Sequence, residues 1–206
     1  MLTQLTDKLH AYVLSFNLPV QALIWTLAIV LTLFAVGMLM GALRHAVIEG
    51  LLARVLGNRL AIFVGYYLTI IGTLHHELAH ALGYLLTGGQ IHKISIFPKP
   101  QPDGSIRLGY VTSSTRGPLL LQALQNTLGA TGPLYFGFLS IWLLRTFAVP
   151  CVSNLYLLIF VWYTIISIAL HMELSPADLR SLARGLLPSL LLLYLVVLLI
   201  TFISSR

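Results

Sequence analysis

The chain is poor in charged residues, and poorest in acidic ones. Only 9% of its 206 residues are charged, and the acidic residues number six against twelve lysines and arginines. A soluble domain carries about 25% charged residues, whereas 58% of this chain is hydrophobic. These proportions exclude a soluble globular domain and predict an integral membrane protein.

Cysteine is nearly absent as well. Cys151 is the only one in the sequence. The chain can therefore form neither an internal disulfide framework nor a zinc site built from several cysteines.

The net charge of +6 does not indicate a nucleic-acid partner. The basic residues are not gathered on one helix or stripe, as they are in nucleic-acid-binding domains. They lie between apolar runs, as the basic residues of bilayer proteins do. We therefore expect the lipid bilayer as a partner, and no nucleic acid.

Long apolar runs predict an all-α polytopic membrane protein that forms a single domain over residues 1–206, with a bundle of about five transmembrane helices. The runs cover residues 19–43, 60–86, 117–149, 153–174 and 186–203. The third is interrupted by Gly-Ala-Thr-Gly-Pro at residues 129–133, which predicts a bent or re-entrant segment followed by a span from about Leu134. Residues 1–18 have roughly helical apolar spacing, which fits an interfacial helix or an unstructured leader.

The periodicity changes after the second run. Residues 91–97 and 105–111 alternate between apolar and polar side chains, and the proline-rich residues 98–104 between them favour a turn. This pattern predicts a small β-hairpin, about residues 89–112, outside the hydrocarbon or at its margin.

Residues 76–80 read His-Glu-Leu-Ala-His inside the second apolar run. Positions four apart lie on one face of a helix, so His76 and His80 can bind one zinc ion. Glu77 can then act as a general base on a water that the zinc activates. A buried helix whose polar groups are satisfied by neighbours is the simpler alternative, but ionisable residues are costly in hydrocarbon and usually mark function.

A catalytic zinc site needs a third protein ligand. Asp178 is favoured, because Pro176 should break the helix there and allow a carboxylate to turn inward. Glu173 and His171 are the other choices, and Asp178 can alternatively cap a helix or pair with a nearby arginine. His75 points about 100° away from His76, so we expect it to pack or to support a ligand.

Three features make the sequence resemble the site-2 protease family of intramembrane zinc metalloproteases, in its compact branch without a PDZ domain. They are the motif at 76–80, the small-residue Gly-Pro segment at 129–134 and an aspartate near a later helix, here Asp178. With the hairpin, the resemblance covers residues 60–185. It implies that His76, His80 and Asp178 bind Zn²⁺ and that Glu77 is the catalytic base. The implied activity is hydrolysis of a peptide bond in or near a substrate's transmembrane segment.

The chain departs from the family pattern around the third ligand. The usual Leu-Asp-Gly is Ala177-Asp178-Leu179 here, and the usual upstream Asn-x-x-Pro is residues 173–176, without asparagine. In place of a PDZ domain, the hairpin can offer an edge strand to an extended substrate, or can simply cap the helices.

The expected substrate is a membrane protein, in the simplest case one with a single span. The apolar runs predict a multi-pass membrane protein, which we expect in the plasma membrane. A small excess of basic residues on the hairpin side predicts that the active site opens to the cytoplasm. Two alternatives remain. One is a membrane zinc protease of another family with Glu173 as third ligand, and the other is a non-catalytic metal-binding scaffold, which would not need Glu77.

Overall fold

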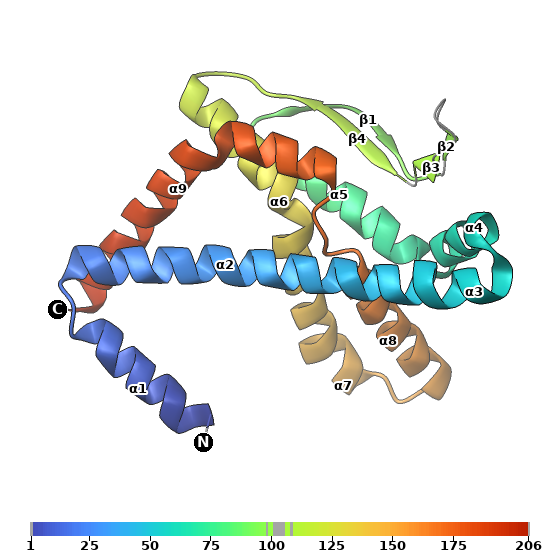
Figure 1. Ribbon diagram of the computed structural model, residues 1–206, viewed down its shortest axis with the longest axis horizontal. Helices are drawn as coiled ribbons and strands as arrows, with labels where there is room; N and C mark the ends of the chain where they lie inside the picture. Colours follow the sequence, from blue (N-terminus) through green and yellow to red (C-terminus); the bar gives the residue numbers. More distant parts are fainter. Residues whose placement is uncertain (1, 98, 101–105, 108, 206) are drawn as a thin grey trace.

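The computed structural model describes residues 2–97, 99–100, 106–107 and 109–205 and is mostly helical (Figure 1). The π-helical segments η1 (His45–Leu52) and η2 (Leu144–Ala148) join α2 to α3 and α6 to α7. The helices are α1 (Leu2–Leu14), α2 (Leu18–Arg44), α3 (Ala53–Leu56), α4 (Asn58–Leu68), α5 (Ile70–Leu86), α6 (Leu119–Leu143), α7 (Val149–Cys151), α8 (Leu155–Leu170) and α9 (Pro176–Ser204).

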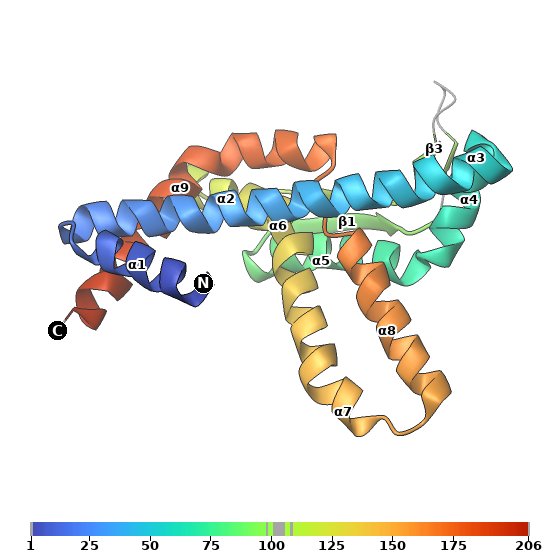
Figure 2. The same ribbon diagram turned by 60° about the horizontal axis from the view of Figure 1, so that its bottom comes forward.

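Three helical stretches in the described part of the chain are long and apolar enough to cross a membrane. They are Leu18–Leu56, Leu119–Cys151 and Pro176–Ser204, and the apolar α8 is shorter. The chain is therefore a multi-pass membrane protein. Figure 2 shows that α6, η2, α7 and α8 form a helical hairpin that projects from the other helices, while α2 crosses it.

The predicted span over residues 60–86 is wrong as one continuous helix. It is divided at Thr69, whose φ of −126° and ψ of 26° leave the helical region. The Thr69 hydroxyl donates to the carbonyl of Gly65 at 2.8 Å, which satisfies an acceptor at the end of α4. The motif therefore lies on α5, a separate helix of 17 residues that packs against α6 and α8.

The predicted re-entrant segment at residues 129–133 is wrong, because α6 runs through these residues as one helix. The alternative that the helix bends there stays a prediction. A proline inside a helix removes one backbone hydrogen bond and leaves the carbonyl four residues earlier without its donor. Here that carbonyl belongs to Gly129, and it accepts a hydrogen bond from the His80 ring instead, at 2.7 Å. The helix continues because α5 satisfies the group that Pro133 leaves free.

The last span begins ten residues before its predicted start at residue 186, since α9 starts at Pro176. Ser175 caps the helix: its hydroxyl accepts from the Asp178 N–H, and the Asp178 carboxylate accepts from the Ser175 N–H. Proline at the first helical position completes a strong start signal. Residues 176–185, which lie between the apolar runs 153–174 and 186–203, therefore form the first turns of α9.

The predicted hairpin is confirmed as a small antiparallel sheet of β1 (Gln90–Ser95) and β4 (Tyr110–Ser114), with the second strand later in the sequence than predicted. Beyond them β2 (Lys99–Pro100) pairs with β3 (Ile106–Arg107). Most of the predicted turn, residues 101–105, lies outside the described residues. The buried Tyr66 hydroxyl donates to the carbonyl of Ile96, which ties the hairpin to α4.

Helices α5 and α6 approach each other so closely that glycine is required at their contact. A Cβ on Gly132 would lie 2.4 Å from the Ala79 carbonyl oxygen, and one on Gly83 would lie 2.3 Å from that of Leu128. Both contacts are backbone contacts, so no side chain can move aside. The residues of the motif are therefore fixed against α6.

We predict that Gly132→Ala lowers the free energy of unfolding by about 1–3 kcal/mol, because the added methyl group forces the two backbones apart. The control is Gly50→Ala, where the nearest atom would lie 3.8 Å away. Thermal unfolding of the detergent-solubilised variants measures both. Equal stability of the two variants would contradict the close packing described here.

Candidate metal centre

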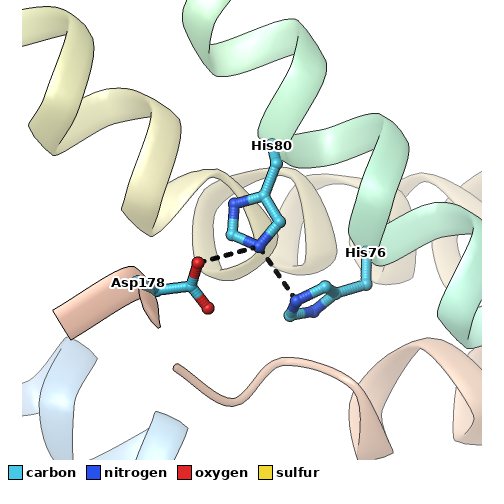
Figure 3. A group of neighbouring side chains, drawn as sticks. All are labelled: His76, His80 and Asp178. Atoms are coloured by element: carbon cyan, nitrogen blue, oxygen red, sulfur yellow. Dashed lines mark hydrogen bonds and ion pairs between the residues drawn. The ribbon is translucent and has the colours of Figure 1, made fainter. Parts of the chain in front are cut away.

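His76 and His80 lie one turn apart on the face of α5 that meets α6 and the start of α9. Figure 3 shows their rings close to each other and to the Asp178 carboxylate. The Nε2 atoms of the two histidines are 2.9 Å apart, and His80 Nε2 is 3.4 Å from Asp178 Oδ1. Three potential ligands from two distant parts of the sequence thus converge on one point.

Backbone carbonyls fix the orientation of both rings. His80 Nδ1 lies 2.7 Å from the Gly129 oxygen, and His76 Nδ1 lies 2.6 Å from the His171 oxygen. A carbonyl oxygen can only accept a hydrogen bond, so each Nδ1 must carry a proton. In a neutral imidazole each Nε2 then holds a lone pair, which is the state of a metal-binding histidine.

Each of these carbonyls is available for a local reason. Pro133 lacks the N–H that would otherwise bind the Gly129 oxygen. His171 follows the last residue of α8, where carbonyl groups lose their helical partners. The sequence therefore leaves two backbone acceptors free where the two motif histidines need them.

Asp178 serves two roles at once, one with each carboxylate oxygen. Oδ2 accepts from the Ser175 N–H at 2.8 Å, while Oδ1 faces His80. The expected alternatives, helix capping and metal binding, are therefore compatible. The capping contact fixes the carboxylate and leaves one oxygen for a cation.

The donor set fits a divalent metal. Two protonated Nδ1 atoms leave two lone pairs directed at each other across 2.9 Å, which is unfavourable unless a cation lies between them. Ligand atoms of His76, His80 and Asp178 all lie within 4.8 Å of one another. Two imidazoles and a carboxylate form a three-ligand set of the kind found at catalytic zinc, with one position left open.

Glu173 does not join this group. Its carboxylate forms an ion pair with Arg44 at the end of α2, and a Cβ on Gly41 would lie 2.9 Å from Glu173 Oε2. The pair holds the α8–α9 connection against α2. That connection carries both the His171 carbonyl and Asp178, so Glu173 supports the cluster from outside it.

The side chains of His171 and His75 also point elsewhere. His171 Nε2 lies 3.1 Å from the Thr73 hydroxyl and its Nδ1 is 3.0 Å from the Ser167 carbonyl oxygen. His75 Nε2 lies 2.9 Å from the hydroxyl of Ser140 on α6. His75 thus packs against α6, in the direction predicted from its position on the helix.

Glu77 is buried, with 6% of its surface exposed. It lies under the residue that precedes β4: a Cβ on Gly109 would be 2.5 Å from Glu77 Oε1. The hairpin therefore packs directly over the carboxylate. Only glycine leaves room for the carboxylate at this place.

A cavity of about 1400 Å³ adjoins the cluster. His76, Glu77 and His80 form part of its lining, and the rest comes from β4, α6 and the first turns of α9. Most of these other side chains are polar. Water and a substrate of considerable size can therefore reach the cluster.

The hairpin wall of the cavity is electrically positive. A hydrogen bond with the Lys93 ammonium, together with the charges of Lys93 and Lys99, lowers the pKa of the Tyr110 phenol. Tyr110 itself lines the cavity. A negatively charged group in the cavity would be stabilised at this wall.

A family model described as Peptidase M50B-like matches residues 47–206. The chain belongs to this family, which is related to the site-2 proteases and comprises intramembrane metalloproteases. Comparisons with curated proteins and with solved structures give no match. Membership implies metallopeptidase activity, and the matched region contains all three residues of the cluster.

The sequence did not reveal every residue that builds the cluster. No sequence pattern indicated Gly109, because its importance comes from its close contact with Glu77 in the folded protein. The orienting carbonyls of Gly129 and His171 are backbone groups, which no side-chain pattern can indicate. Pro133 was visible, but it was interpreted as a bend and not as the reason for a free acceptor.

A comparison of two carboxylate variants tests the ligand choice. We predict that Asp178→Asn lowers zinc affinity by more than about a hundredfold, because it removes the negative charge of an oxygen that binds the metal. Glu173→Gln, which also removes one negative charge, should keep one zinc per chain. Metal analysis after dialysis against a competing chelator measures both, and loss of zinc only from the Glu173 variant would overturn the assignment.

Replacing Pro133 tests whether the Gly129 carbonyl must be kept available for His80. Pro133→Ala restores an N–H that competes with His80 for the Gly129 oxygen. We expect about a tenfold loss of zinc affinity, as for other partners that orient a metal-binding histidine. Pro188→Ala is the matched control, since Pro188 also lies inside a helix, α9, but away from the cluster; equal affinity of the two variants would contradict the role of Pro133.

Proposed function

We propose that the protein is an intramembrane zinc metalloprotease that hydrolyses a peptide bond in or near the transmembrane segment of a single-span membrane protein. The observation that carries the proposal is the convergence of His76, His80 and Asp178 beside Glu77 in one large cavity. Family membership supports the reaction class. The apolar helices support a substrate that is embedded in the same bilayer.

Each residue of the site has its own chemical role in hydrolysis. His76, His80 and Asp178 would hold a zinc ion, which would act as a Lewis acid toward a carbonyl group and would make water a stronger acid. Glu77 takes a proton from the attacking water and passes it to the leaving amine. Gly109 packs over the Glu77 carboxylate, and Glu77 lines the same cavity as the three ligand residues.

Strand β4 is suited to bind the substrate in an extended form. It pairs with β1 on one side, and five consecutive β4 residues, Tyr110–Ser114, line the cavity. Successive strand residues point to opposite faces of a sheet, so a run of five indicates that the cavity meets the edge of the strand. A substrate added at this edge would present its backbone, including the bond to be cut, to the cluster.

We place the protein in the plasma membrane with the cavity open to the cytoplasm. Arg180 and Arg184 on α9 line the cavity, and Lys93 and Lys99 of the hairpin lie near Tyr110, which also lines it. Short loops and helix ends rich in lysine and arginine generally remain on the cytoplasmic side.

The proposal predicts that Glu77→Gln retains zinc but loses proteolysis by at least about a thousandfold, because the amide cannot accept the proton from water. The control is Asp7→Asn, the same chemical change at an exposed residue of α1. Zinc content and cleavage of membrane-protein substrates in proteoliposomes measure the two effects. Unaltered cleavage by the Glu77 variant would refute the proposed mechanism.

The natural substrate can be found with the same variant. Quantitative proteomics should compare cells that express the wild-type protein with cells that express Glu77→Gln. A single-span membrane protein should accumulate uncut in the cells with the variant.

A further inference from the structure

Two arginines form part of the cavity wall on α9. Arg180 and Arg184 line the same cavity as His76, Glu77 and His80. They lie one helical turn apart and therefore project from the same side of α9. They follow Asp178 by two and six residues, so they begin next to the cluster and extend away from it.

Neither arginine has an acidic partner among the side chains that the structure describes. The chain has only six acidic residues, and most are committed elsewhere. Glu173 is paired with Arg44, Asp178 faces His80, and Glu77 lies under Gly109. Asp7 is on α1, and the side chains of Glu49 and Asp103 lie outside the described part.

The hairpin adds positive charge beside the cavity. The ammonium groups of Lys93 and Lys99 lie 6.0 and 5.7 Å from the centre of the ring of Tyr110, and Tyr110 is one of the residues that line the cavity. Clefts bordered by charges of one sign concentrate the electric field and attract the opposite charge. A substrate segment that enters between β4 and α9 therefore passes a positive potential on both sides.

We propose that Arg180 and Arg184 are specificity-determining residues, which select substrate segments that carry aspartate or glutamate close to the cleaved bond. This inference rests on the proposed proteolytic function and adds the chemical class of its substrate. Arginine suits the task because its guanidinium binds a carboxylate through two parallel hydrogen bonds.

The helix geometry sets where the acidic residue should be. At 1.5 Å per residue, Arg180 and Arg184 lie about 3 and 9 Å beyond Asp178 along α9. An extended peptide advances about 3.3 Å per residue. The aspartate or glutamate of a preferred substrate should therefore lie within about three residues of the cleaved bond, in the part of the substrate that runs along α9.

Anionic lipid headgroups are the other ligand that arginines at a membrane surface attract. A general preference for basic residues on one side of the membrane would place arginines on that side, but it does not require them in the cavity wall. Arg180 and Arg184 line one cavity together with the catalytic cluster and with β4. These positions favour a polypeptide over a lipid.

The experiment uses the zinc-loaded protein in nanodiscs of zwitterionic lipid and a library of single-span peptides with randomised flanks. Mass spectrometry of the products gives the frequency of acidic residues within three positions of each cut. We expect enrichment of about three- to tenfold for the wild type, as for two partly exposed ion pairs. The double variant Arg180→Gln/Arg184→Gln should lose this enrichment of acidic residues. The double variant Arg180→Glu/Arg184→Glu should instead cut peptides that carry lysine or arginine near the cleaved bond.

The matched control is Arg54→Gln/Arg145→Gln, which removes two positive charges from exposed residues that do not line the cavity. This variant should retain the acidic preference. An equal loss of preference in the control would show an effect of net charge only and would overturn the inference.

A binding measurement separates this inference from the proposed function. Peptides from the same library are captured on immobilised Glu77→Gln protein, with and without the two arginines. If the wild type cuts no peptide, the proteolytic function fails, but enrichment of acidic peptides that depends on the arginines would still support the inference. Cleavage or capture that shows no preference for acidic peptides would overturn the inference. So would arginine variants that change only the amount of the anionic lipid phosphatidylglycerol retained by the purified protein.

Discussion

The structure depends on two hydrogen bonds from imidazole N–H groups to backbone carbonyls. His80 binds the Gly129 oxygen and His76 binds that of His171. These contacts choose the tautomer of each ring and direct both Nε2 atoms to one point. They also join α5 to α6 and to the end of α8, so the arrangement of the helices and the chemistry of the cluster have the same origin. The internal proline leaves the Gly129 oxygen available to His80, and close glycine contacts hold α5 against α6.

Much of the site was predictable because its chemistry is local in the sequence. The motif at residues 76–80 fixes two donors and a carboxylate by helical spacing alone, and the structure brings Asp178 to them as the third member of the group. The fold was predicted less well. Hydrophobicity indicated helices correctly, but it could not show that Thr69 divides one run or that α9 begins at Pro176. These boundaries coincide with local hydrogen bonds, at Gly65 and at Ser175, that average hydropathy does not contain.

The α8–α9 connection shows why tertiary contacts were needed to choose among Asp178, Glu173 and His171. All three lie within eight residues of one another, and each is chemically able to bind zinc. Their different roles follow from their neighbours. Glu173 forms an ion pair with Arg44, and the His171 ring forms hydrogen bonds with Thr73 and Ser167. The Asp178 carboxylate is oriented by its hydrogen bond with the Ser175 N–H. One short segment thereby supplies a candidate ligand, an orienting carbonyl and an ion pair with α2.

The central claim is that two imidazoles and one carboxylate hold the zinc ion. X-ray absorption spectroscopy at the zinc edge of the purified, active protein tests it most directly. The account predicts a four-coordinate first shell of nitrogen and oxygen at about 2.0–2.1 Å, with outer-shell scattering from two imidazole rings. A sulfur scatterer at about 2.3 Å, or scattering from one or three imidazoles, would contradict it.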